Sequence, residues 1–186
     1  MKKAVLLLVA LPFLFLGCSH MARKPVSISW PAQFDNLEAM CEIDVQLRTE
    51  KYNGDMSLKV SYPHRLFLEV YGPFGNTILS VDRSDDHFTM LMDGEELTDE
   101  NDFYRLFRIR INDIIEDLTL KGPLENEGRA AVRQRQDYTV YYYLNDTENR
   151  ICWKVREGDF CITFLEVNFS REKPIAKSDS GRELLL

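Results

Sequence analysis

The strongest constraint on the fold is an alternation of apolar and polar residues that begins near residue 41. In CEIDVQLR, residues 41–48, every second residue is apolar, and a period of two places those side chains on one face of a β-strand. Further strands of this kind are expected over 56–62, 66–70, 77–81 and 88–92, and Asn53-Gly54-Asp55 favours a hairpin turn after the first strand. Strands joined by short turns predict an antiparallel meander.

The period changes to that of a helix between residues 98 and 118. The acidic residues of Thr98-Asp99-Glu100 suit a first helical turn, and the apolar residues that follow fall close to one helical face. Because Asn112 is a favourable N-cap, we expect two short helices with a break near 109–111, the second ending at Gly122-Pro123. The period of two then returns, and strands are expected near 129–135, 137–144, 149–156 and 160–169.

This order of elements predicts a mainly β (α+β) fold. We expect a curved, incomplete antiparallel β-barrel of about nine or more strands, with a short helical lid inserted mid-chain. A sheet that is apolar along one face must cover something, and the helical stripe is a natural partner for it. Periodicity leaves open whether the interior is packed solid or stays partly empty.

The N-terminus has the features of an export signal. Two lysines precede an apolar run over residues 4–16 that is too short for a comfortable membrane span. The stretch FLGCS, residues 15–19, resembles the bacterial lipobox, which implies cleavage before Cys18 and lipidation of that residue. Ser19 then implies sorting to the outer membrane, where the anchored chain faces the periplasm. The alternative is an ordinary signal peptide followed by a chance cysteine.

We therefore divide the chain into four parts. Residues 1–17 are the expected lipoprotein signal peptide, and the polar residues 18–36 are a lipidated tether. Residues 37–169 form the folded domain, and the polar residues 170–186 form a flexible tail.

Charge and motifs argue against several classes of function. The formal net charge of −7 argues against nucleic acid as a partner, because phosphate binding requires a basic face. The sequence has no GxSxG elbow, no GxGxxG loop and no P-loop, so we expect no enzyme activity and no catalytic residue. Without a CxxC pair or paired histidines we expect no metal site, and no cofactor beyond the lipid on Cys18.

Three cysteines remain after Cys18 in a domain that would enter an oxidising compartment. Cys41, Cys152 and Cys161 allow three pairings. We favour a disulfide between Cys152 and Cys161, because they flank an apparent hairpin. Three buried, unpaired thiols are the alternative.

Phe74 stands in the turn GPFG, residues 72–75. A benzene ring exposed there loses about 2–3 kcal/mol relative to burial, and such a side chain at a turn is often a contact point for a membrane or a partner. The alternative is a ring folded back under its own turn.

Three methionines lie on the expected strands: Met56, Met90 and Met92. They suit the wall of a cavity that re-packs around different ligands, although an ordinary core with methionine as filler also explains them.

Residues 37–169 resemble the family of LolB, the outer-membrane lipoprotein that receives other lipoproteins from the periplasmic carrier LolA. The resemblance is carried by LFLEVYGPFGNTILSV (66–81), DGEELTDEN (93–101), NDIIEDLTLKGP (112–123) and the tyrosine-rich strand over 137–143. It implies a nearly closed half-barrel with helices at its mouth, and a hydrophobic cavity that holds the acyl chains of a lipoprotein.

The same resemblance implies roles for particular residues. The loop of Pro73, Phe74 and Gly75 would help to deliver cargo into the bilayer, with Phe74 where the family typically has leucine. The partners implied are outer-membrane lipid, lipoprotein acyl chains and a LolA-like carrier, and we expect a monomer. The acyl-chain cavity would be lined by Val45, Leu47, Met56, Leu58, Val60, Leu66, Leu68, Val70, Met90, Met92, Phe103, Phe107, Ile111, Ile114 and Ile115.

Two other functions compete with receipt and insertion of lipoproteins. One is a structural or assembly lipoprotein of the envelope with a solid core. The other is a lipocalin-like binder of small hydrophobic ligands. A cavity large enough for an acyl chain separates the first of these from the LolB-like function.

Overall fold

The computed structural model describes residues 27–145 and 147–171, and the predictions for the signal peptide, for Cys18 and for residues 172–186 of the tail lie outside them. The described part contains eleven strands and two helices. These are β1 (Asn36–Leu47), β2 (Glu50–Ser61), β3 (Arg65–Tyr71), β4 (Thr77–Ser84), β5 (His87–Met92), β6 (Glu95–Leu97), α2 (Glu100–Phe107), α3 (Ile111–Leu118), β7 (Glu125–Glu127), β8 (Ala130–Gln134), β9 (Tyr138–Leu144), β10 (Asn149–Val155) and β11 (Gly158–Ser170).

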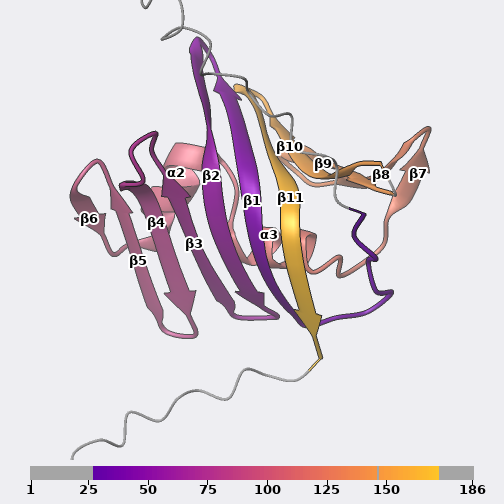
Figure 1. The fold of residues 1–186 in the computed structure, drawn as a ribbon. Coiled ribbons are helices and arrows are strands. Elements are labelled where there is room, and N and C mark those ends of the chain that lie inside the picture. The colour runs from indigo at the N-terminus through magenta and orange to yellow at the C-terminus, as the bar shows by residue number, and fades with distance from the viewer. Residues whose placement is uncertain (1–26, 146, 172–186) are drawn as a thin grey trace, which may run out of the picture.

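All eleven strands form one antiparallel sheet, in the order β6-β5-β4-β3-β2-β1-β11-β10-β9-β8-β7 (Figure 1). The first and last strands of the domain therefore lie side by side in the middle of the sheet, and Leu37 pairs with Phe169. The prediction of a mainly β, antiparallel fold is confirmed.

The sheet is open, and the expected near-closure into a barrel is not found. Its edges, β6 and β7, have three residues each and do not pair with one another. The chain between these two edge strands contains the helical segment, and α2 contacts β5 while α3 contacts β2 and β3, so the helices cover one face of the sheet. Edges this short also offer few backbone groups for pairing.

The hairpin turn expected at Asn53-Gly54-Asp55 is wrong, because these residues lie inside β2. The turn is at Arg48-Thr49, and Leu47 pairs with Glu50 across it. Gly54 is required for a close approach instead: the Tyr52 hydroxyl donates to the carbonyl oxygen of Tyr71, and a Cβ at Gly54 would collide with that phenol.

Two short helices with a break between them are confirmed, but α3 ends at Leu118 and not at the expected Gly122-Pro123. α2 is capped by Asp99, whose side chain accepts from the backbone N–H of Asn101, and it ends at Arg108 in the left-handed conformation. The N-cap of α3 is Arg110 rather than the expected Asn112, and its side chain makes no capping bond. The apolar stripe of α3 is buried against the sheet: Ile111, Ile114, Ile115 and Leu118.

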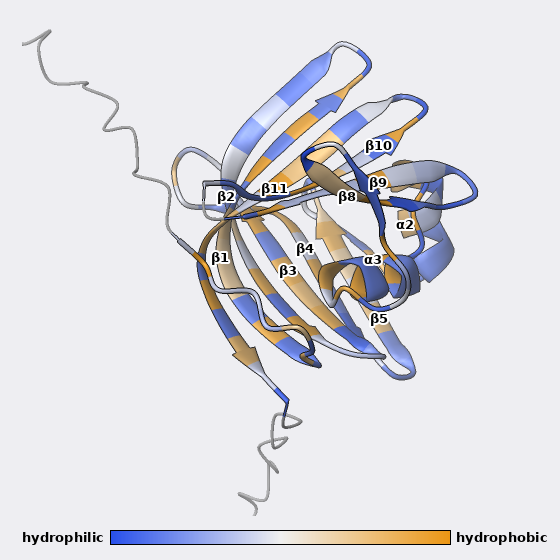
Figure 2. Cartoon of the chain, turned by 90° about the vertical axis from the view of Figure 1, so that its right-hand side faces the viewer, coloured by the Kyte–Doolittle hydropathy of each residue, from blue (hydrophilic) through white to orange (hydrophobic). Residues whose placement is uncertain are grey.

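The core lies between the helices and one face of the sheet, as the alternating hydropathy of the strands in Figure 2 indicates. The residues before β1 contribute to it. Phe34 is buried, and the ring of Trp30 lies 5.1 Å from the rings of both Phe164 and Phe169. Its indole N–H donates to Asn149 at 3.1 Å. Packing against the sheet therefore begins upstream of residue 37, within the segment expected to be a tether.

Candidate functional site

An apolar cavity of about 360 Å3 lies between the sheet and the two helices. Its volume falls within the range of about 300–1,000 Å3 that is usual for small-molecule sites. Strands β1 to β5 supply one wall, β10 and β11 supply another, and α2 and α3 cover it with Phe103, Phe107, Ile114 and Leu118.

Ten of the predicted cavity residues line this space. They are Val45, Leu47, Met56, Leu58, Leu68, Val70, Met92, Phe103, Phe107 and Ile114. The alternation places them correctly because each strand residue of this set lies on the inner face of its strand.

Five other predicted residues do not line the cavity, and each belongs to the solid core. These residues are Val60, Leu66, Met90, Ile111 and Ile115. Val60 pairs with Leu66 across β2 and β3, two rungs from the Met56–Val70 pair that does line the cavity. Val60 and Leu66 share the inner face but border a second groove toward the other end of the sheet, and periodicity does not show where along a face a space opens.

Sequence reasoning missed ten lining residues. Ile43 continues the alternation of β1 and could have been found, as could Phe160 and Ile162 on β11. Trp153 could not, because its place depends on the pairing of β10 with β11. The full set that was missed is Ile43, Glu50, Tyr52, Ile78, Leu79, Asp93, Leu118, Trp153, Phe160 and Ile162.

Helix α3 is held over the cavity by a buried carboxylate, that of Asp117. It accepts hydrogen bonds at 2.8 Å from both Arg133 and Arg135, which neutralise its charge. The indole N–H of Trp153, on the cavity wall, donates to it at 3.0 Å. The helix is therefore tied to β8 and β10 through one side chain.

Two tyrosines of β9 complete this Asp117 cluster. The hydroxyl of Tyr138 donates to Asp117 at 3.2 Å and that of Tyr142 donates at 3.4 Å. Burial raises the pKa of both hydroxyls, and the negative charge of Asp117 raises each pKa further. Both tyrosines therefore remain neutral donors at physiological pH.

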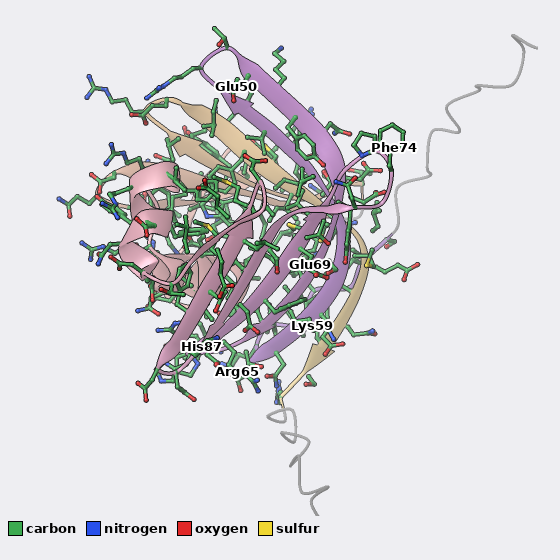
Figure 3. The ribbon with its side chains drawn as sticks, turned by 90° about the vertical axis from the view of Figure 1, so that its left-hand side faces the viewer. Glu50, Lys59, Arg65, Glu69, Phe74 and His87 are labelled. Carbon is green, nitrogen blue, oxygen red and sulfur yellow. A yellow bond between two sulfur atoms is a disulfide. The ribbon has the colours of Figure 1, made fainter. Side chains whose placement is uncertain are left out.

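The turn between β3 and β4 holds Phe74 in water. The ring is 95% exposed, which excludes a ring folded back under its own turn. The backbone of the turn is closed by two hydrogen bonds, from Gly75 N to Gly72 O at 2.9 Å and from Gly72 N to Asn76 O at 2.7 Å. Gly75 has φ of 77°, which favours glycine. Figure 3 shows Phe74 on the side of the sheet away from the helices.

Cys152 and Cys161 form a disulfide across β10 and β11, where they pair directly. The next pair along these strands is Trp153 and Phe160, whose rings stack on the cavity side at 5.1 Å. Since neighbouring pairs face opposite sides of a sheet, the disulfide lies on the outer face behind this stack. Cys41 is a free, buried thiol, and burial raises its pKa well above the ordinary range.

A larger groove of about 640 Å3 lies near the other end of the sheet, where Figure 3 shows Lys59 and Arg65. Its lining is mixed and includes Asp82 and Asn168. The inner cavity is the better candidate for an apolar ligand, because its walls are almost entirely hydrocarbon.

Two further findings concern the described residues. They contain no group of three or more His, Cys, Asp or Glu side chains that could hold a metal ion. Within the same residues, neither helix has the length and apolar character needed to cross a bilayer. Comparison of the whole chain with protein-family models and with curated proteins finds no match to either.

Proposed function

We propose that this chain is a LolB-like lipoprotein acceptor, anchored in the outer membrane through Cys18, which binds acyl chains in its apolar cavity and passes lipoproteins into the bilayer. In this proposal the open sheet acts as an incomplete barrel with α2 and α3 as its cover. The observation that carries the proposal is the cavity of about 360 Å3 under these helices.

The physical argument is one of solvation. Each methylene moved from water into an apolar site gains about 0.8 kcal/mol, so a long acyl chain needs a dry surface wherever it travels. A cavity lined by side chains such as Leu58, Val70 and Ile114 offers that surface. Transfer then requires no ATP, provided that the cavity binds the chain more tightly than the donor and less tightly than the membrane.

The exposed ring of Phe74 supports the delivery step. An isolated aromatic side chain held at the tip of a turn can enter the headgroup region and gain the burial that it lacks in water. The backbone bonds that close its turn hold the ring in position. The lipid on Cys18 would keep this turn close to the bilayer.

The cavity argues against the first alternative, a scaffold with a solid core. It is equally compatible with a lipocalin-like binder of small hydrophobic ligands. The two remaining functions differ in cargo: a binder takes up free hydrophobic molecules, whereas an acceptor competes with a carrier for an acylated protein.

The test is a cavity-filling substitution with a matched control outside the cavity. Leu79 lines the cavity, and Leu91, on the neighbouring strand, is 41% exposed on the outer face. We expect Leu79→Trp to abolish uptake of a peptide carrying a diacylglyceryl cysteine and its transfer to vesicles, while Leu91→Trp leaves both intact. Leu47→Trp, at the mouth, serves if Leu79→Trp does not fold. Equal uptake by the cavity and control variants would overturn the proposal, and uptake without transfer would favour the lipocalin-like function.

A further inference from the structure

The cavity is apolar except at one end, where two carboxylates lie. Glu50 opens β2 and pairs with Leu47, which places it on the inner face, whereas the next residue, Lys51, pairs with Gln46 on the outer face. Asp93 follows Met92 in the turn between β5 and β6. In the part of the chain that the structure describes, Glu50 and Asp93 are the charged residues that line the cavity.

Both carboxylates are at the same end of the sheet, and this end is the mouth of the cavity. In an antiparallel meander the β1–β2, β3–β4 and β5–β6 turns lie at one end. Glu50 and Asp93 are exposed and flank the turn that holds Phe74, and Figure 3 shows Glu50 at the tip of its hairpin. Since the other lining residues are almost all apolar, the chain of an amphiphilic ligand would lie inside the cavity and its head would be left at the end where these two side chains lie.

The charge at the mouth is not neutralised. Neither Glu50 nor Asp93 forms an ion pair with any described residue. The nearest basic residues in sequence, Arg48 and Lys51, do not line the cavity. The formal net charge of −7 adds to the negative potential.

We propose that the mouth selects ligands by the charge of their head: the cavity takes acyl chains attached to neutral or positively charged heads and discriminates against free fatty acids and other anionic amphiphiles. This inference rests on the proposed function, because it assumes that the cavity binds acyl chains. A carboxylate or phosphate head would lie beside two like charges at the edge of a low-dielectric interior, where repulsion is stronger than in bulk water. An amide, an ester or an ammonium group meets no such penalty.

The experiment compares three probes with the same dodecyl chain: dodecanoate, N-dodecylacetamide and dodecylammonium. Each displaces a neutral fluorescent hydrophobic probe from the full-length protein at pH 7 and low salt, below its critical micelle concentration. We expect the neutral and cationic probes to bind several-fold more tightly than dodecanoate. The difference in affinity between dodecanoate and the other two probes should narrow in the variant Glu50→Gln/Asp93→Asn, and it should also narrow at high salt. Glu38→Gln/Asp82→Asn, on the outer face, makes the same change in net charge and should keep the difference.

The outcomes separate the two proposals. Equal binding of all three probes by the native protein, or a difference that the mouth variant does not change, overturns the selection and leaves the acyl-chain site standing. An equal narrowing in the outer-face variant also overturns it, because net charge alone would then explain the effect. Binding of none of the probes overturns the acyl-chain site itself, and the selection with it.

Discussion

The indole nitrogen of Trp153 lies 3.0 Å from a carboxylate oxygen of Asp117. A residue of the cavity wall is therefore hydrogen-bonded to α3, one of the two helices that cover the cavity. Asp117 is 0% exposed, and the guanidinium groups of Arg133 and Arg135 supply its counter-charge. Such a carboxylate stabilises the fold only while its donors are present, because an unpaired buried charge is costly.

Removal of this charge should destabilise the domain strongly. We expect Asp117→Asn to lower the free energy of unfolding by about 3–5 kcal/mol, because Arg133 would lose its buried partner. Trp153→Phe, which removes one donor and keeps an aromatic ring, should cost about 1–3 kcal/mol. Urea denaturation measures the free energy of unfolding of both variants.

The control is Asp113→Asn on the same helix, where a partly exposed carboxylate lies 3.5 Å from Arg135 and should contribute about 0–1 kcal/mol. Equal costs at positions 113 and 117 would contradict the role given to Asp117.

Stability should fall at alkaline pH through Tyr138 and Tyr142. The pKa of each is raised in the folded state, so the folded protein holds these protons more tightly than the unfolded chain. Their contribution is complete below about pH 10, the ordinary tyrosine pKa, and is lost as the pH rises from there through the folded pKa values. In that range, each tyrosine lowers the free energy of unfolding by about 1.4 kcal/mol per pH unit.

Denaturation at several pH values above 9 measures this slope, and comparison with Tyr138→Phe/Tyr142→Phe isolates the two groups. The double variant starts from lower stability, because two hydrogen bonds to Asp117 are lost, but its slope should be shallower. An identical slope in the variant would mean that other groups carry the alkaline loss.

The disulfide between Cys152 and Cys161 should stabilise the domain by about 2–3 kcal/mol, because it closes a loop with a sequence separation of 9. We expect Cys152→Ala/Cys161→Ala to lower the melting temperature to the value that the native protein shows with excess reductant. Reductant should then leave the variant unchanged. A further fall in the variant would point to a different effect of the reductant, since the remaining described cysteine, Cys41, is unpaired.

Phe74→Glu should leave folding intact and impair delivery to membranes. The side chain is 95% exposed, so the free energy of unfolding should change by less than about 0.5 kcal/mol. Vesicle binding of the soluble domain should fall roughly tenfold or more, because the ring can no longer be buried in the bilayer. Phe74→Leu should retain most of the vesicle binding.

The matched control is Leu106→Glu, which alters another exposed apolar residue, on α2. Normal delivery by Phe74→Glu would exclude the turn as a membrane contact.

The sequence predicts the inner faces of the strands well and the boundaries of the site poorly. Val45, Leu58 and Val70 follow from alternation alone, because a strand has two faces and one of them must be dry. Gly54 led to a wrong prediction of a turn, because Asn-Gly usually marks a hairpin. The structure explains a glycine within this strand by the phenol of Tyr52, which lies against it.

The Asp117 cluster was beyond sequence reasoning for a physical reason. Its partners are 16 to 36 residues away and come from β8, β9 and β10. In the sequence of its own helix, Asp117 is one more polar residue beside an apolar stripe. The acidic mouth was equally hidden, because Glu50 opens β2 and Asp93 follows β5, and only the order of the strands and the cavity between them places both at one end of the sheet.

The pairing of β1 with β11 has a consequence for how the domain is made. The two wings of the sheet, β2 to β6 and β7 to β10, are joined along the β1–β11 pairing, and β11 is the last of the described strands to leave the ribosome. Until that strand arrives, β1 has a bare flank and the space beneath the helices lacks a wall. The space beneath the helices is therefore enclosed only after β11 has paired with β1, so the cavity depends on contacts between the two ends of the described domain.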